Sequence, residues 1–472
     1  MGVQSTSSIS GYRHIQDLPC PGGLPILGNL HQLALSPAHR KLELWAKELG
    51  SPYRFNLLGQ PFVVWTDVEL CHAAMRDRPF RYRRHAYLQE LFSEIGADGV
   101  FFAEGEDWLP QRKLVTEAMS TPNIRRMYPK LRLMSERFCE RLRRHAMRDG
   151  LVRMTEELKR YTLCMTRMLV FGEGIDVLEG NDAVHRNLTL IFPAMQRRIL
   201  APFPYWRYPL FNSRRFRLAV DDIHRHIGVM IDQARSRVRE RPDDPHDLLE
   251  AMVAWQDTPG SEVTDQQIAA NVLTLFLAGE DTTAYSLAWA IYCVLTNDDA
   301  RRLLIDKADA ALGPDTVCPS YEKLRELDLF EAVCTESGRF RPVIPTHGLE
   351  PLEDVFIGDV HVPKGTKMVF LNRPSTLDAA HFVCPHAFRP ERWLESDRKN
   401  FEPHKSKAFM QFGSGPRVCP GRHLAGVEMR IVLSMLMKNF HVELAADPGS
   451  IKETFALTMR PSCLPLYLKN RT

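Results

Sequence analysis

One cysteine of this 472-residue sequence lies where a thiol could do chemistry. Cys419 ends the run Phe412-Gly-Ser-Gly-Pro-Arg417-Val-Cys, and Pro-Gly421 and a helical pattern follow it. A cysteine in a glycine-rich loop that opens a helix lies near unpaired backbone N–H groups and the positive end of the helix, and both favour the thiolate. Such a thiolate could bind a metal or act as a nucleophile. The alternative is an inert buried thiol, which the surrounding glycines and arginine argue against.

A second group of polar residues interrupts the apolar run 268–295, which contains Ala278-Gly-Glu-Asp281-Thr282-Thr. Ala278 and Thr282 are four residues apart and share one helix face, where small side chains would let a flat cofactor approach the backbone. The Thr282 hydroxyl can bond to the carbonyl four residues earlier and loosen the helix. Asp281 with Thr282 would then form a proton relay. The alternative is a core helix with an acidic cap, which fits poorly because the acids lie inside the apolar run.

Two further pairs have helical spacing. Glu336 and Arg339 are three residues apart and can form an ion pair on one helix. Trp108 and Arg112 are four residues apart, so that one helix face presents an indole N–H and a guanidinium, which suit an anionic group.

The elements that must position these residues are mostly helical. A Pro/Gly-rich segment at 19–29 is followed by a helix ending at Gly50 and by a strand, a turn and a strand over 52–66. Helical periodicity dominates 66–300, strands return at 350–370, a helix covers 421–440, and 455–469 is predicted to be a hairpin. We expect a mainly α fold with small antiparallel β-sheets. Residues 1–18 are expected to form a flexible N-terminal segment and 19–472 a single domain.

Composition excludes several classes of protein. Lys and Arg number 61 against 58 for Asp and Glu, a near-balance that argues against a nucleic-acid binder. The ten cysteines contain no CxxC pair, which argues against a disulfide scaffold and a zinc ribbon. The run 268–295 is long enough to span a bilayer, but Glu280 and Asp281 near its middle would each cost about 2.5–3.5 kcal/mol there. No membrane anchor is expected.

Together these motifs resemble the cytochrome P450 (haem-thiolate monooxygenase) superfamily. Its FxxGxRxCxG, ExxR, PERF-like, (A/G)GxDTT and WxxxR patterns recur here in the family order, and the resemblance runs from about residue 19 to the end. It implies haem b (iron protoporphyrin IX) between the central helix and the cysteine loop, with Cys419 as the iron ligand. The cofactor contacts that it implies are Trp108, Arg112, Ala278, Gly279, His347, Phe412, Arg417, Cys419 and Gly421. It gives Glu336, Arg339 and Arg392 a structural role.

One position departs from the family pattern. After the ExxR helix many relatives place an arginine that binds a haem propionate, whereas this chain reads Pro342-Val-Ile-Pro-Thr-His347-Gly-Leu-Glu350. His347 is the only nearby donor that could substitute for it. The alternative is a loop histidine that faces solvent.

The resemblance implies a monooxygenase that inserts one atom of O2 into a small apolar organic substrate, with Asp281 and Thr282 delivering protons. Two alternatives stay open: a haem-thiolate peroxygenase or isomerase, and a non-catalytic haem-binding protein. The aromatic segment 191–211 and residues 85–103, 343–346 and 456–458 are expected to line the substrate pocket.

The sequence contains no flavin or iron–sulfur motif, so electrons are expected from a separate ferredoxin or flavodoxin with its NAD(P)H reductase. Five basic residues could form a docking face for it, or could be scattered surface charge: Arg125, Arg126, Arg341, Arg422 and Lys438. We expect a monomeric, cytoplasmic, bacterial-type enzyme.

Overall fold

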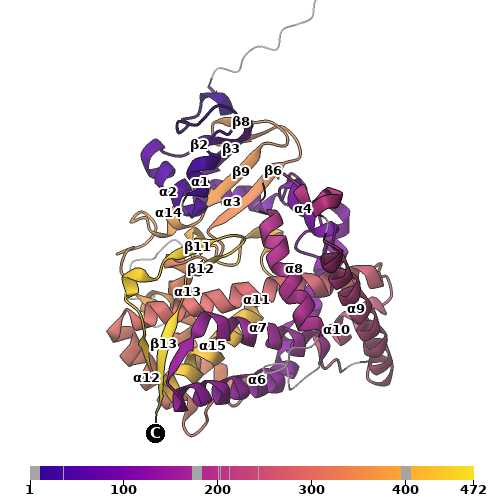
Figure 1. Ribbon diagram of the computed structural model, residues 1–472, viewed down its shortest axis with the longest axis vertical. Helices are drawn as coiled ribbons and strands as arrows, with labels where there is room; N and C mark the ends of the chain where they lie inside the picture. Colours follow the sequence, from indigo (N-terminus) through magenta and orange to yellow (C-terminus); the bar gives the residue numbers. More distant parts are fainter. Residues whose placement is uncertain are drawn as a thin grey trace, which may run out of the picture.

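The computed structural model describes residues 11–35, 37–172, 183–199, 201, 203–211, 213–242, 244–394 and 406–471. Most of the strands gather at one end with α1, α2 and α3, and most of the other helices form the larger part of the molecule (Figure 1). The helices are α1 Leu30–Ala34, α2 Ala38–Leu49, α3 Val68–Arg76, α4 Ala86–Ser93, α5 Trp108–Ala118, α6 Thr121–Met147, α7 Met154–Phe171, α8 Ala183–Ile199, α9 Arg214–Glu240, α10 Leu248–Gln256, α11 Asp265–Leu295, α12 Asp298–Leu312, α13 Asp328–Phe340, α14 Arg373–Thr376 and α15 Arg422–Asn439. The expected mainly α fold is confirmed.

The strands form four small sheets, of which the largest has the order β2-β3-β9-β6-β4. Most pairings are antiparallel, but β3 pairs with β9 and β1 with β8 in parallel. In the tail only β11 and β12 form the expected hairpin, whereas β13 pairs with β10 and β5. The strands are β1 Arg13–His14, β2 Tyr53–Leu57, β3 Gln60–Trp65, β4 Tyr82–Arg83, β5 Leu151–Arg153, β6 Thr346–Pro351, β7 Val355–Ile357, β8 Val360–Val362, β9 Lys367–Leu371, β10 Phe440–Leu444, β11 Glu453–Phe455, β12 Met459–Pro461 and β13 Pro465–Asn470.

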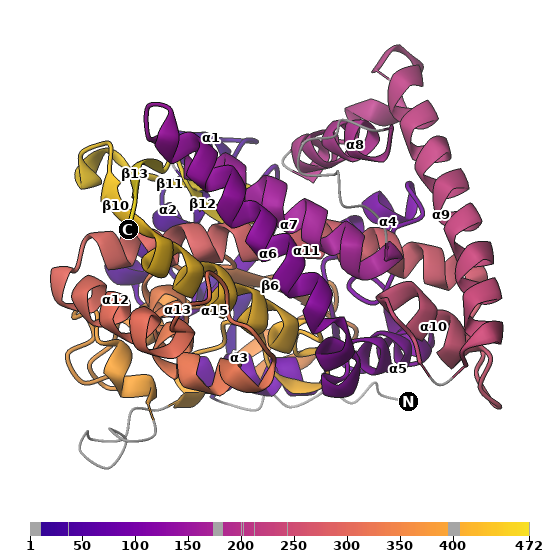
Figure 2. The ribbon, with the colours of Figure 1, turned by 90° about the horizontal axis from the view of Figure 1, so that it is seen from below.

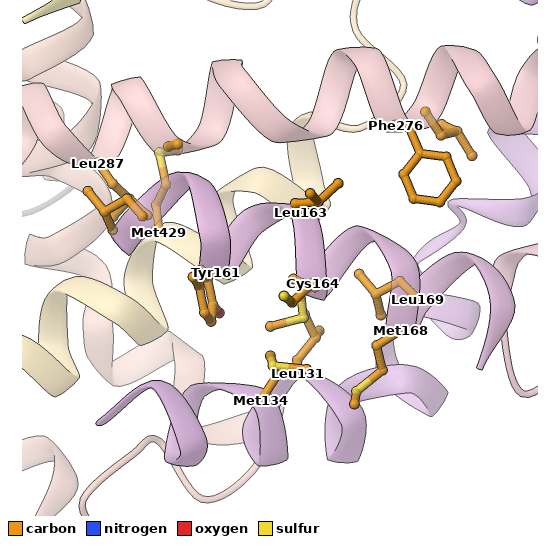
Figure 3. Packing of buried hydrophobic residues seen from close by; sticks show 14 of the residues in the cluster. Leu131, Met134, Tyr161, Leu163, Cys164, Met168, Leu169, Phe276, Leu287 and Met429 are labelled. Atoms are coloured by element: carbon orange, nitrogen blue, oxygen red, sulfur yellow. The ribbon is translucent and has the colours of Figure 1, made fainter. Parts of the chain in front are cut away.

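The helix α11 runs through the middle of the helical part. It begins with a capping box between Thr264 and Gln267, and it packs against α7, α13 and α15. Figure 3 shows Phe276 and Leu287 of α11 directed toward α7, with further apolar side chains filling the space between α7 and α6. Leu287 is fully buried, and truncating a buried leucine to alanine typically costs about 2–5 kcal/mol. Packing therefore fixes α11 along its length.

Part of the expected flexible N-terminal segment packs against the body of the protein. Arg13–His14 pair with β8, Arg13 forms an ion pair with Asp359 at 2.7 Å, and Ile15 and Leu18 are buried. Two buried apolar side chains are enough to hold this short stretch in place, so the expected flexibility does not extend to residues 13–18. Residues 1–10 lie outside the described residues.

In the part of the chain that the structure describes, none of the helices has both the length and the apolar character needed to cross a membrane. This includes α11, which the sequence analysis considered as a membrane span.

Candidate functional site

The cysteine loop depends on two glycines with positive φ. Gly413 and Gly415 have φ of 76° and 69°, and a Cβ on Gly415 would lie 2.5 Å from the Met75 carbonyl oxygen of α3. The positive φ values let the loop turn back on itself, so that the Cys419 N–H donates to the Phe412 carbonyl at 2.8 Å. The thiol is thereby placed just ahead of α15.

The Cys419 side chain meets the backbone N–H groups of Gly421 and Arg422, as expected for a thiol at a helix start. Burial nevertheless raises the pKa of the Cys419 thiol, because it outweighs these N–H groups and the positive charges of Arg112 and Arg422. The N–H groups thus favour the thiolate as predicted, and burial works against them. A metal that binds the sulfur would supply the missing stabilisation, since a coordinating thiol is deprotonated outright.

The middle of α11 has an open face inside the molecule. The helix is buried on both sides of this point, yet Ala278 is exposed and Thr282 is half-buried. The Thr282 hydroxyl donates to the Ala278 carbonyl at 2.6 Å, as the four-residue spacing predicted. The helix α11 also packs on α15, which begins directly after the cysteine loop.

Gly279 does not share that face. A Cβ on Gly279 would lie 2.8 Å from the Thr166 hydroxyl of α7. The glycine therefore makes room for the neighbouring helix, and its expected role as a cofactor contact is wrong. The reason is the helical period, since the residue next to Ala278 in sequence is turned about 100° away from it.

Asp281 is held by two residues that the sequence analysis did not single out. Lys159 of α7 lies 3.0 Å from Asp281 Oδ1 and 3.1 Å from Glu280, and Gln196 of α8 donates to Asp281 Oδ2 at 3.0 Å. Burial opposes the charge on Lys159, but the two carboxylates raise its pKa overall. Burial raises the pKa of Glu280. Thus α7, α8 and α11 meet at the acid of the predicted relay.

The predicted structural residues form one buried network. Glu336 and Arg339 are fully buried, and they pair at 2.8 Å and 3.0 Å. Glu336 also accepts hydrogen bonds from Arg392 at 3.2 Å and from the Trp393 indole at 2.8 Å. Arg339 donates to carbonyls of Thr376, Pro385 and Ala387, and so connects α13 to the end of α14 and to the segment that follows it. This arrangement agrees with a structural role.

The predicted anion-binding donors converge beside the cysteine loop. The Arg417 guanidinium lies 4.9 Å from the centre of the Trp108 ring, and Arg112 donates to the Val418 carbonyl at 2.7 Å. Arg417 Nε and Nη1 are buried without a hydrogen-bond partner in the described structure, although Arg417 pairs with Glu104 at 2.9 Å. Orphaned cationic donors beside the cysteine loop fit a cofactor with acidic side groups.

His347 lies in β6, where it is half-buried, and not in a solvent-facing loop. Burial, reinforced by the positive charges of Arg84 and Arg78, lowers the pKa of His347 to about 3. Its Nε2 lies 3.1 Å from the Asn372 amide nitrogen. His347 is therefore neutral at pH 7 and cannot replace the charge of an arginine.

An apolar cavity with about 10 Å³ of free volume lies between α4, α8, α9 and α11. Its walls include Phe92 of α4, Ile95 just after α4, Phe192 and Met195 of α8, and Leu277 of α11. Of the regions expected to line a pocket, 85–103 and 191–195 do so, whereas 343–346 and 456–458 do not contribute to this cavity.

The aromatic segment 191–211 was expected to line the substrate pocket, but its residues 203–211 do not line this cavity. The side chains of Phe203, Tyr208 and Phe211 are more than half exposed, and Trp206 is buried with its indole N–H bonded to Glu94 at 2.8 Å. The prolines and short 3₁₀ turns of 203–211 carry these rings over the surface instead of into the cavity.

Most of the predicted docking residues already have partners. Arg125 pairs with Glu322 and Lys438 with Asp309. Arg341 pairs with the buried carboxylate of Glu453, which holds its guanidinium away from the surface. The prediction that Arg341 belongs to a docking face is therefore wrong. Arg126 is 3.8 Å from Asp244. Arg422 is exposed and has no ion pair among the described residues.

The functional residues that sequence reasoning missed are contributed by other elements: Arg78, Arg84 and Glu104 beside Arg417, and Lys159 and Gln196 beside Asp281. The run Arg76–Arg84 contains five arginines. This cluster of arginines in the sequence could have pointed to Arg78 and Arg84. The sequence around Lys159 and Gln196 contains no comparable signal.

Comparison with known proteins identifies the family of the chain. The family model described as Cytochrome P450 matches residues 18–466. The chain is 28% identical to human mitochondrial 25-hydroxyvitamin D-1 alpha hydroxylase, covering 92% of this chain and 86% of that protein. It is 24% identical to cytochrome P450 3A31 of Mesocricetus auratus, covering 91% and 86%. The crystal structure of the cytochrome P450DA heme domain superposes with a TM-score of 0.85 at 21% identity, covering 96% of this chain and 98% of that one. The match over nearly the whole chain shows that the protein belongs to the cytochrome P450 family, which makes it a haem b-dependent monooxygenase.

Proposed function

We propose that this monooxygenase oxidises a small apolar substrate bound in the cavity between α4, α8, α9 and α11, with Cys419 as the iron ligand. The observation that carries the proposal is the apolar lining of the cavity, to which α4, α8, α9 and α11 all contribute. Its free volume is about 10 Å³, room for one water molecule, so side chains of the wall must shift to admit a substrate. His224 is the one ionisable side chain in the cavity wall, and its Nε2 already contacts the Ile95 carbonyl at 2.8 Å. A charged substrate would find no partner in that wall.

Haem b, when bound, activates dioxygen and supplies the oxidising chemistry. The chain supplies the surroundings: Cys419, just ahead of α15, would bind the iron, and Arg112, Arg417 and Trp108 would hold the acidic groups of the cofactor. The small side chain of Ala278 would leave space for it on α11. The apolar cavity excludes water from the substrate.

The proton path runs along α11. Thr282 Oγ1 holds a proton at the open face, where the Ala278 carbonyl orients it. Asp281 resupplies that proton, and Lys159, whose side chain is 35% exposed, connects Asp281 to solvent. Gln196 ties the same carboxylate to α8, one wall of the cavity. The intact acid and alcohol favour oxygen activation over the peroxygenase, isomerase and non-catalytic alternatives.

We propose that electrons come from a separate ferredoxin or flavodoxin, which docks near Arg422. This residue begins α15, immediately after the cysteine loop, and its charge is free to attract an acidic partner. Arg126 and Arg125 add exposed positive charge, although each is near a carboxylate. The monomer state stays a prediction.

The haem ligand is tested by Cys419→Ser, with Cys384→Ser, an exposed cysteine, as the control. The reduced, carbon-monoxide-bound protein should show the red-shifted Soret band of thiolate ligation, and only Cys419→Ser should lose it. Retention of that band in Cys419→Ser would mean that another cysteine binds the iron.

The electron donor is tested by Arg422→Glu against Arg225→Glu. Arg225 lies on α9, at the edge of the molecule in Figures 1 and 2. At limiting donor, turnover should fall as salt rises, since the Debye length is about 8 Å at physiological ionic strength. Arg422→Glu should weaken donor affinity while Arg225→Glu does not. Equal effects of the two variants, or donor affinity that ignores salt, would refute this docking site.

A further inference from the structure

The described residues do not balance the positive charge around Arg417. The side chains of Arg78 and Arg417 are each 3% exposed, and Arg84 lies beside both. These three arginines share one carboxylate, that of Glu104. Glu104 Oε1 lies 3.3 Å from Arg78 and accepts the backbone N–H of Arg84 at 3.0 Å, while Oε2 lies 2.9 Å from Arg417. Two positive charges therefore have no opposite charge among the described residues.

The donors of these arginines are also incompletely used. Arg78 Nε and two nitrogens of Arg417 are buried without a hydrogen-bond partner in the described structure. Arg84 donates through Nε to the Phe101 carbonyl at 2.9 Å, and its terminal nitrogens have no acceptor among the described residues. Its guanidinium stacks on the Phe101 ring at 3.7 Å, which holds it in one orientation. Fixed, unsatisfied donors are what a planar anion needs.

We propose that Arg78 and Arg84, with Arg417, bind the two propionate carboxylates of haem b, and that they take the place of the arginine that the chain lacks near His347. Two carboxylates would balance the two uncompensated charges. His347 is close to the same arginines but is neutral, so it contributes no charge to this balance. The proposal rests on the haem site at Cys419, and it assigns the propionate contacts to the turn around β4 instead of β6.

The test compares Arg84→Gln with Arg83→Gln in the haem-loaded protein. Arg83 is the adjacent residue, but it pairs with Glu350 at 2.9 Å and is absent from the cluster. Haem loss is followed as transfer to excess apomyoglobin. Loss of a hydrogen bond to a charged group corresponds to about ten- to hundredfold faster haem loss in Arg84→Gln. Arg83→Gln and His347→Gln should stay within about twofold of the unaltered protein.

Reconstitution with haem dimethyl ester, in which both propionates are esterified, tests whether Arg84 binds a propionate. Arg84→Gln and the unaltered protein should lose the ester at the same rate, because the partner of Arg84 is then missing. If Arg84→Gln does not fold, the same comparison is made with Arg84→Lys, which keeps the charge and should lose haem at an intermediate rate.

Haem loss from Arg84→Gln that matches Arg83→Gln would overturn the proposal, and so would an equal acceleration with haem and with its ester. Faster haem loss from His347→Gln alone would mean that His347, and not Arg84, contacts the propionate. All of these outcomes leave the thiolate Soret band intact, whereas failure of the haem site itself removes that band from every variant.

Discussion

Replacing Glu336 by glutamine should destabilise the whole protein, although Glu336 touches no part of the proposed substrate cavity. The carboxylate is fully buried and accepts five hydrogen bonds: two from Arg339, and one each from the Arg389 backbone, Arg392 and the Trp393 indole. Glutamine has nearly the same shape but no charge. Its NH2 group would replace an oxygen that accepts hydrogen bonds, and would therefore face other donors. Two buried guanidiniums would lose their only carboxylate in this network.

The expected magnitude follows from this burial. Breaking a buried ion pair by removing one partner costs about 3–5 kcal/mol, against a total stability of about 5–15 kcal/mol for a typical protein. The variant should therefore unfold at a clearly lower urea concentration, and accumulate with less haem. Arg339 would also hold the carbonyls of Thr376, Pro385 and Ala387 less firmly, which loosens the loops around α13.

The matched control is Glu331→Gln on the same helix. Glu331 pairs with Arg430 at 3.1 Å, but its side chain is 57% exposed, and exposed pairs contribute about 0–1 kcal/mol. Urea unfolding of both variants is followed by tryptophan fluorescence and by the Soret band. If Glu336→Gln loses no more stability than Glu331→Gln, the network does not hold the fold and this reasoning is refuted.

Three further predictions concern α11 and α15. Thr282→Ala should keep haem and substrate binding but send reducing equivalents to hydrogen peroxide, and product formation should fall by about 10²–10⁴-fold; unchanged coupling between NAD(P)H use and product would contradict the relay. Gly279→Ala should cost about 1–3 kcal/mol of unfolding free energy through its contact with Thr166, and adding Thr166→Ala should recover most of it, which urea unfolding can check. Burial raises the pKa of Glu428 to about 8, so the folded state holds a proton that the unfolded state releases near pH 4.3. Stability should therefore fall as the pH rises from about 4 to 8, and the urea midpoint of Glu428→Gln should change less between pH 5 and pH 8 than that of the unaltered protein.

The sequence by itself was sufficient to predict the features that depend on local spacing. The i, i+3 pair of Glu336 and Arg339 and the i, i+4 bond from Thr282 to Ala278 follow from the helical period, and both occur in the structure. The glycines before Cys419 predicted a loop that turns sharply ahead of a helix, and Gly415 allows the close contact with α3. The family motifs, which consist of such local patterns, predicted the fold and the cofactor for the same reason.

The tertiary structure decided everything that depends on burial and on distant partners. Burial raises the pKa of Cys419 against the effect of its own loop, and it leaves His347 neutral. Which carboxylate an arginine meets is also a long-range property: Arg341 turns inward to Glu453, and Arg84 shares Glu104 with Arg417. Sequence spacing carries no record of these charges, because desolvation and Coulomb energy depend on distances in space between different elements of the chain.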